Sequence, residues 1–243
     1  MTIWLYALCG QERDMLPFFL RHYVPEVDRV VLLNGGMDEA SLRIAYEYSH
    51  TEVHPSPFAK GGYDDKLFVD YAADKYKEAR GYADWVIWVD IDEILYTPYS
   101  LHDALEQYRS REILAVQCDG YQMTSYHFPY GAWLLTDSVK IGAYDKIYNK
   151  MSCFDPRLNV KWSVGRHSCD IDGLCPTPTG MKLLHYRYFG DEWLAARNKR
   201  NQSRRSADDI KTGRGYHVAP DYDGGRYSAA WYKEILEAGK EVI

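Results

Sequence analysis

An uninterrupted apolar run at residues 85–89 (Trp-Val-Ile-Trp-Val) leads straight into the acidic cluster Asp90-Ile91-Asp92-Glu93. Five residues are too few for a helix, and tryptophan and β-branched side chains favour strands. A strand that is apolar at every position has to be buried on both faces, as in a sheet with helices on either side. The run therefore predicts a central strand of an α/β sheet that ends in carboxylates.

The acids at the end of this run suggest a ligand site, because open α/β sheets bind ligands at the carboxyl ends of their strands. Side chains at positions i and i+2 of a strand share a face, so Asp90 and Asp92 converge if the strand extends that far. Neighbouring carboxylates repel unless a cation lies between them, and hard divalent cations prefer such oxygen ligands. The cluster predicts a metal site that holds a phosphorylated substrate. The alternative is a solvated loop whose acids cap the next helix.

Strand-like and helix-like segments alternate along the first 90 residues. The expected strands lie at 3–9, 28–33 and 51–54. The expected helices lie at 15–23, 38–48 and 63–80. Such alternation predicts a mostly parallel, Rossmann-like sheet with right-handed crossovers and helices on both faces.

The alternation continues with a helix at 101–108 and a strand at 113–118, and then weakens. Short aromatic-rich strands are expected at 121–126, 139–141 and 146–148. They are followed by a strand at 181–186 and helices at 191–202 and 228–238, with a mobile Gly- and Tyr-rich stretch at 213–227. The second half is therefore expected to add irregular strands to the same sheet.

The length of 243 residues favours a single domain, and the net charge of −6 argues against a nucleic-acid partner. The N-terminus lacks the basic region of a signal peptide, and no apolar run approaches the roughly 20 residues of a membrane helix. Five cysteines without a C-x-x-C pair favour a reducing, cytoplasmic compartment. The alternative is a zinc site made by Cys153, His167, Cys169 and Cys175, although this spacing matches no common zinc pattern.

Six stretches of the chain carry a resemblance when they are taken in order. They are Tyr6-Ala7-Leu8-Cys9-Gly10-Gln11-Glu12-Arg13-Asp14-Met15-Leu16-Pro17, Val27-Asp28-Arg29-Val30-Val31 with Asn34-Gly35 and Asp38, Asp84-Trp85 through Asp92-Glu93, Tyr144-Asp145-Lys146-Ile147, Gly165-Arg166-His167 and Leu183-Leu184-His185-Tyr186. This ordered set resembles the GT-A-fold glycosyltransferases of the family 2-like group. The match extends to about residue 205, and the set is far more specific than the Asp-x-Asp-Glu motif alone.

The resemblance implies a GT-A fold and transfer of a sugar, with inversion, from a nucleotide-diphosphate sugar to a hydroxyl of a glycan or other acceptor. It also implies Mn²⁺ or Mg²⁺ as a cofactor, held by Asp90, Asp92 and His185, and an imidazole ligand favours Mn²⁺. The single domain 1–243 would then consist of a nucleotide-sugar-binding half, 1–118, and an acceptor-side half with closing helices, 119–243.

The resemblance also implies roles for other side chains. The nucleotide-sugar site would contain Glu12, Asn34, Asp90, Lys146, His167 and Arg197. Inversion needs a carboxylate that takes the acceptor proton, and the candidates are Asp145, with Asp137 and Asp191 as its rivals. Leu33 stands where many relatives carry an acid that contacts the base, which leaves the base open. The basic stretch 197–214 would bind donor phosphates or touch an anionic membrane surface.

Three other functions compete with this interpretation. A sugar-nucleotide nucleotidyltransferase would need a Gly- and Arg-rich loop after the first strand, which residues 10–13 match poorly. An Asp-x-Asp phosphohydrolase would place its motif after the first strand and follow it with Thr, where this chain has Ile94. A carbohydrate-binding module could use the 22 tyrosines and 7 tryptophans, but it would not need a buried strand that ends in acids.

Overall fold

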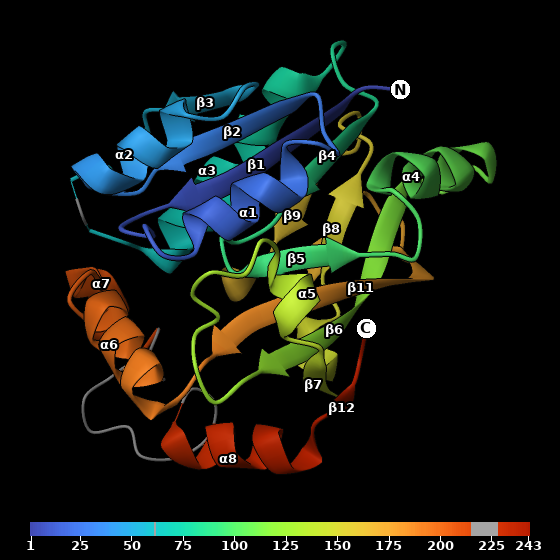
Figure 1. Ribbon diagram of the computed structural model, residues 1–243. Coiled ribbons are helices and arrows are strands. Elements are labelled where there is room, and N and C mark those ends of the chain that lie inside the picture. The colour runs from blue at the N-terminus through green and yellow to red at the C-terminus, as the bar shows by residue number, and fades with distance from the viewer. Residues whose placement is uncertain (61, 215–227) are drawn as a thin grey trace.

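The computed structural model describes residues 1–60, 62–214 and 228–243 (Figure 1). In these residues the strands are β1 (Ile3–Cys9), β2 (Arg29–Asn34), β3 (Thr51–His54), β4 (Trp85–Trp88), β5 (Glu93–Tyr96), β6 (Ala115–Thr124), β7 (Ile141–Tyr144), β8 (Met151–Phe154), β9 (Lys161–Trp162), β10 (Cys169–Asp170), β11 (Thr177–Tyr188) and β12 (Lys240–Glu241). The helices are α1 (Leu16–Tyr23), α2 (Glu39–Tyr46), α3 (Asp65–Lys75), α4 (Leu101–Ser110), α5 (Leu135–Ser138), α6 (Asp191–Gln202), α7 (Ala207–Thr212) and α8 (Ala229–Ala238), with 3₁₀ turns η1 (Tyr76–Ala79), η2 (Lys146–Tyr148) and η3 (Val164–Arg166).

A single mixed sheet has the strand order β12-β7-β6-β8-β4-β1-β2-β3, and β11 pairs with both β6 and β5. The strands of the first part of the chain, β4, β1, β2 and β3, are parallel neighbours. The later strands join in mixed directions, as the loss of alternation predicted. The predicted α/β class is confirmed.

The carboxyl ends of six strands lie at one edge of the sheet. β1, β2, β3 and β4 are parallel to one another. β8 is antiparallel to both β4 and β6, so β6 has the direction of β4, and β11 is parallel to β6. The segments that follow these strands therefore meet at one edge, beside which α6 and α7 also lie (Figure 1).

Helices cover both faces of this sheet because successive side chains of a strand point to opposite faces. Ile87 of β4 belongs to the apolar core under α1, α2 and α4, whereas Val86 and Trp88 belong to the core under α3. All four residues of β4 are buried. The continuous apolar run is therefore explained by a strand that is enclosed on both sides, as predicted.

The acidic cluster does not continue this strand. β4 ends at Trp88, and the chain turns back through residues 90–92, where the Glu93 N–H donates to the Asp90 carbonyl oxygen (2.9 Å). β5 then begins at Glu93 and runs antiparallel to β11. The prediction that Asp90 and Asp92 share one face of an extended strand is therefore wrong, because the motif forms a tight turn.

The middle of the chain also differs from the predicted strands. One strand, β6, replaces the two expected at 113–118 and 121–126, and β7 lies later than the strand expected at 139–141. Gly120 allows β6 to pass η2, because a Cβ there would lie 2.3 Å from the backbone carbonyl carbon of Tyr148. Residues 146–148 are a 3₁₀ turn rather than a strand, since the Asp145 carboxylate accepts from the Ile147 N–H (3.1 Å) and caps it.

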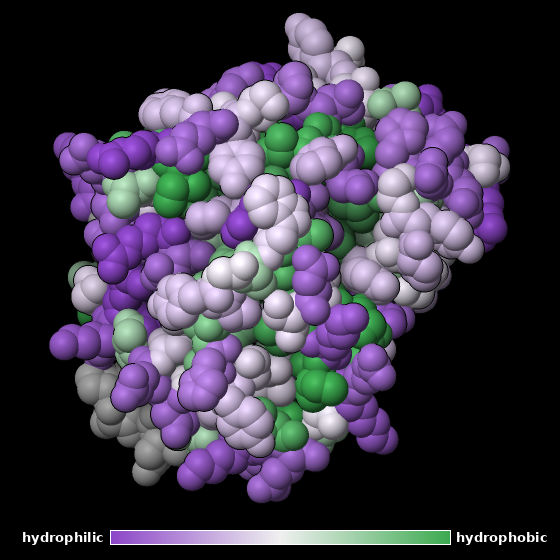
Figure 2. All heavy atoms as spheres, in the orientation of Figure 1, coloured by the Kyte–Doolittle hydropathy of each residue, from purple (hydrophilic) through white to green (hydrophobic). Residues whose placement is uncertain are grey.

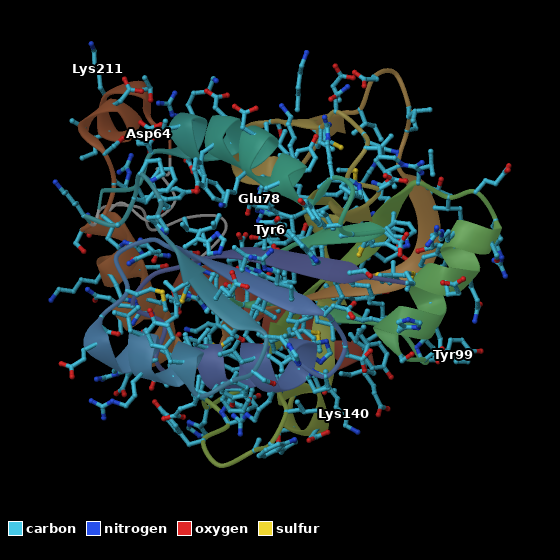
Figure 3. The ribbon with its side chains drawn as sticks, turned by 90° about the horizontal axis from the view of Figure 1, so that it is seen from above. Tyr6, Asp64, Glu78, Tyr99, Lys140 and Lys211 are labelled. Atoms are coloured by element: carbon cyan, nitrogen blue, oxygen red, sulfur yellow. The ribbon has the colours of Figure 1, made fainter. Side chains whose placement is uncertain are left out.

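The C-terminal part of the chain is joined to the start of α3. The Asp209 carboxylate accepts from the Asp65 N–H (3.0 Å), and the Ser206 hydroxyl donates to Asp64 (2.9 Å). Figure 3 shows Asp64 and Lys211 near one another where α3 and α7 meet. The expectation of a mobile stretch at 213–227 lies outside the described residues from position 215 onward. None of the described helices has the length and apolar character needed to cross a bilayer.

His22 on α1 gives the fold a pH dependence that can be tested. Burial lowers the pKa of His22 to about 4, although its ring nitrogen lies 3.0 Å from the Leu95 carbonyl oxygen. The unfolded chain takes up this proton near pH 6.5, so the free energy of unfolding should fall by about 3 kcal/mol between pH 6.5 and pH 4. Urea titrations across this range should show a shallower fall for H22Q than for the wild type or for H50Q, an exposed control.

Candidate active site

The turn after β4 is held at the carboxyl edge of the sheet by backbone and side-chain bonds. The Glu93 carboxylate accepts from the Asp90 N–H (2.9 Å), and the Tyr186 N–H of β11 donates to the Asp92 carbonyl oxygen (2.7 Å). The first contact fixes the turn internally, and the second ties it to the neighbouring strand. The side chains of Asp90 and Asp92 consequently start from a rigid backbone, and each meets a different set of partners.

Asp90 and Glu93 share a group of basic partners on one side of the turn. Lys150 Nζ lies 2.5 Å from Glu93 Oε1 and 3.6 Å from Asp90 Oδ2. Arg166 donates to Asp90 Oδ1 (2.5 Å) and to the Trp88 carbonyl oxygen (3.3 Å). Glu93, Lys150 and Arg166 are nearly inaccessible to solvent, whereas 42% of the Asp90 side chain is exposed. These four residues are called the buried ion network below.

Asp92 has different partners. His185 Nε2 and one guanidinium nitrogen of Arg197 each lie 3.0 Å from Asp92 Oδ2. On its other side, His185 Nδ1 lies 2.6 Å from Gln122 Oε1, and Gln122 Nε2 donates to Asp145 Oδ2 (2.9 Å). A chain of contacts therefore runs from Asp145 through Gln122 and His185 to Asp92.

This chain of contacts fixes the imidazole tautomer of His185. Gln122 presents its amide oxygen to the ring because its nitrogen donates to Asp145, so His185 Nδ1 carries a hydrogen. In the neutral ring, Nε2 then directs a lone pair at the Asp92 carboxylate. Two electron-rich atoms at 3.0 Å need either a proton or a cation between them, and metal-binding histidines are typically oriented in this way by a partner on the other ring nitrogen.

Asp92 and His185 are therefore the two predicted ligands that could hold a divalent cation, and Arg197 contacts the same Asp92 oxygen. Among the described residues, no three His, Cys, Asp or Glu side chains converge closely enough to hold a metal ion. Asp90, the third predicted ligand, instead contacts Arg166 and Lys150. An imidazole beside a carboxylate favours Mn²⁺ over Mg²⁺, and with only two protein ligands the ion would need further oxygens from a bound phosphate.

Three arginines of the C-terminal part face this edge of the sheet. Arg197 and Arg200 of α6 lie 3.8 and 3.9 Å from the Glu12 carboxylate, which follows β1. Arg204 donates to the Gly35 carbonyl oxygen after β2. Arg197 is buried and Arg200 is half-buried, whereas Lys199 between them is exposed. The spacing of the helix thus turns part of the basic stretch 197–214 inward, and membrane contact by the stretch stays a prediction.

The charges around the two aspartates keep both of them ionised. Burial raises the pKa of Asp92, but Arg197 and His185 lower it by more, so it lies well below its usual range. Burial likewise raises the pKa of Asp90, which Arg166 and Lys150 bring below the usual value. Burial lowers the pKa of Lys150, yet the neighbouring Glu93 and Asp90 raise it overall. Asp90, Asp92 and Lys150 are therefore charged at neutral pH.

The other predicted site residues lie at the periphery or have local roles. Asn34 closes the turn after β2 by accepting from the Gly36 and Met37 N–H groups (both 3.0 Å). His167 contacts the Ile147 carbonyl oxygen (2.9 Å), and burial lowers its pKa to about 4. Lys146 is exposed. Asp137 is exposed and accepts from the Leu134 N–H (3.2 Å) at the start of α5.

Four residues of the site were not assigned roles from the sequence: Glu93, Gln122, Lys150 and Arg166. Glu93 and Arg166 stand inside the quoted motifs, so their place in the ordered set was the available signal. Arg166 has φ 55° after Gly165 at φ 75°, a backbone conformation that turns its side chain back to β4. Gln122 and Lys150 lie in strand-like surroundings, and no local pattern distinguishes them. The zinc alternative is not supported, because Cys153 and Cys169 belong to different cores.

Comparisons with known proteins do not identify a family for this chain. A scan against protein-family models finds no match, and a search of curated proteins finds none either. Among solved structures, the chain is similar to mannose-1-phosphate geranyltransferase from Thermus thermophilus, with 12% identity, a TM-score of 0.30, and coverage of 100% of this chain and 73% of that chain. It is also similar to UDP-glucose pyrophosphorylase complexed with UDP-glucose, with 11% identity, a TM-score of 0.29, and coverage of 89% and 88%. Similarity this distant assigns neither a family nor an activity to the chain.

Proposed function

We propose that this chain is a metal-dependent glycosyltransferase that moves a sugar from a nucleotide-diphosphate sugar to an acceptor hydroxyl. The observation that carries the proposal is the Asp92–His185 pair, oriented by Gln122, at the edge where six strands end. Arg197 contacts the same Asp92 oxygen at 3.0 Å. A carboxylate, an imidazole and a guanidinium at one point suit a divalent cation together with an anionic phosphate group.

The proposed donor diphosphate would be bound by charges that the fold already holds in place. Asp92 and His185 would hold Mn²⁺ or Mg²⁺, which offsets the charge of a diphosphate leaving group when it is bound. Arg197 and Arg200 would bind diphosphate oxygens and exchange their contacts with Asp92 and Glu12 for contacts with the ligand. The buried ion network would keep the turn rigid during this exchange.

The resemblance to the family 2-like group supports inversion, which needs a base for the acceptor hydroxyl. Asp145 lies behind His185 and contacts Gln122, so its geometry supports a positioning role. Asp137 caps α5. The assignment of either residue as the base stays a prediction. A nucleotidyltransferase that joins a sugar phosphate to a nucleoside triphosphate would use the same kinds of charges, and it is the alternative that an experiment has to separate.

The proposal is tested by a thermal-shift screen of nucleotide-diphosphate sugars with and without Mn²⁺. A ligand at about a hundred times its Kd stabilises the native state by about 2.7 kcal/mol, so we expect the melting temperature to rise by roughly 5–10 °C. The rise should require both the sugar nucleotide and Mn²⁺, because two protein ligands hold the ion weakly without phosphate oxygens. A sugar nucleotide that binds should also release nucleoside diphosphate slowly in water and faster with an acceptor.

Other outcomes of this screen contradict the proposal. Release of pyrophosphate from a nucleoside triphosphate and a sugar 1-phosphate would show the nucleotidyltransferase alternative. Stabilisation by free glycans alone, with no response to any nucleotide or to Mn²⁺, would show a carbohydrate-binding module.

A further inference from the structure

Three large aromatic side chains project into solvent from the loop between β6 and α5. Tyr126, Tyr130 and Trp133 are 71%, 74% and 68% exposed. The loop between β6 and α5 lies on the face that α1 and α5 present to the viewer in Figure 1, and large pale side chains gather at the centre of that face in Figure 2. The donor site described above uses none of them. Three exposed aromatic side chains within eight residues are typical of a surface that binds a ligand.

The loop that presents these aromatics is firmly anchored. Phe128, at its middle, is buried and stacks on Trp193 of α6, with ring centroids 4.0 Å apart and an interplanar angle of 20°. Phe18 of α1 packs edge-on against the Phe128 ring, with ring centroids 5.7 Å apart. Arg21 donates to the Ala132 carbonyl oxygen (3.5 Å). A ligand that covers the exposed rings would therefore lose little free energy to ordering of the loop.

A cavity of about 310 Å³ lies between this loop and the start of α1. Its lining includes Tyr130 and Trp133 of the loop together with Arg13, Asp14 and Arg21. The Arg21 guanidinium lies 5.0 Å from the Trp133 ring centroid. Aromatic faces next to a carboxylate and guanidinium groups match a pyranose ring, which has an apolar C–H face and a rim of hydroxyls. The volume is at the lower end of the roughly 300–1,000 Å³ of small-ligand pockets.

The cavity and the acidic site share two structural elements. On α6, Trp193 supports the aromatic loop and Arg197, one turn later, contacts Asp92. After β1, Arg13 and Asp14 line the cavity directly beside Glu12, which contacts Arg197 at 3.8 Å. A sugar in the cavity would therefore lie beside residues that are direct neighbours of the proposed donor site in α6 and after β1.

We infer that this cavity binds a pyranose unit of a carbohydrate, stacked on Trp133 and Tyr130 with its hydroxyls toward Arg13, Asp14 and Arg21. If the proposed glycosyltransferase function holds, this sugar belongs to the acceptor, and the acceptor is a glycan. The sugar-binding part of the inference does not depend on the donor site.

The test is saturation-transfer-difference NMR with maltose, cellobiose, chitobiose and lactose at millimolar concentration, one at a time. At least one of them should receive signal from the wild type, strongest at the ring protons of its apolar face. W133A and Y130A should bind it roughly three- to tenfold more weakly, because an aromatic contact is removed. Both side chains are exposed, so truncation leaves the fold intact. Y99A and Y46A remove equally exposed tyrosines at other places and should bind as the wild type does; Figure 3 shows Tyr99 beside α4.

Two results would overturn the inference: no signal for any of the four disaccharides with the wild type, or an unchanged signal with both W133A and Y130A. The nucleotide screen separates this failure from failure of the proposed function. Disaccharide binding that depends on Trp133, without any binding of a nucleotide sugar, would support the sugar site and contradict the proposed transferase function. Nucleotide-sugar binding without disaccharide binding would support the transferase function and contradict the sugar site.

Discussion

Replacing Asp92 by alanine is expected to abolish Mn²⁺-dependent binding of nucleotide-diphosphate sugars and to lower the rate of sugar transfer at least about a hundredfold. Loss of a residue that only supports a metal ligand already lowers activity by up to about a hundredfold, so loss of a ligand itself should cost at least as much. Asp92 is the one carboxylate among the described residues that contacts both His185 and Arg197. Its loss removes a ligand for the ion and the charge that positions the guanidinium. The fold should persist at a lower free energy of unfolding, because Arg197 loses a buried partner but still lies near Glu12, and His185 keeps its contact with Gln122.

Isothermal titration of nucleoside diphosphate with and without Mn²⁺ measures the effect on D92A directly. D92N, which keeps the size of the side chain without its charge, should lose the Mn²⁺ dependence as well. D74A, which removes an exposed acid of α3, should titrate like the wild type. Undiminished Mn²⁺-dependent binding by D92A would show that the cation, if one binds, is held elsewhere.

The sequence predicts the first half of the fold well because local signals there agree with the tertiary structure. Asp38 caps α2 as expected, its carboxylate accepting from the Ser41 N–H (2.9 Å). The unbroken apolar pattern of β4 requires cover on both faces, and the structure provides it. In the second half the aromatic segments lack a clear period. Gly120 allows β6 to pass Tyr148, which lies far along the chain, so no local pattern predicts this approach. The Asp145 cap of η2 is local, but the apolar and aromatic residues that it precedes are typical of a strand.

The candidate site shows the same limit at the level of side chains. Asp92 and His185 were predicted together from the resemblance, and the structure places them 3.0 Å apart. The partners of Asp90 could not be predicted from local pattern, because Lys150 and Arg166 reach it across 60 and 76 residues of the sequence. Their presence changes the interpretation of the motif, since Asp90 belongs to an ion network rather than to a cluster of free carboxylates.

Replacing Glu93 by alanine is expected to lower the free energy of unfolding by about 3–5 kcal/mol, the usual effect of removing one partner from a buried ion pair. Only 1% of the Glu93 side chain is exposed, and Lys150 Nζ lies 2.5 Å from it. E93A leaves the Lys150 ammonium buried beside Arg166 and also removes the acceptor of the Asp90 N–H. Urea denaturation followed by circular dichroism measures the loss.

A double substitution shows whether the loss comes from the unpaired charge. E93L/K150M removes both partners and should be more stable than E93A, because an apolar pair of similar volume replaces a buried ion pair at little cost. E52A is the matched surface control. It breaks the partly exposed Arg29–Glu52 pair, whose shortest distance is 2.6 Å, and should cost less than about 1 kcal/mol. If E93A were no more destabilising than E52A, Glu93 would not hold the turn, and the rigidity assumed for Asp90 and Asp92 would need another source.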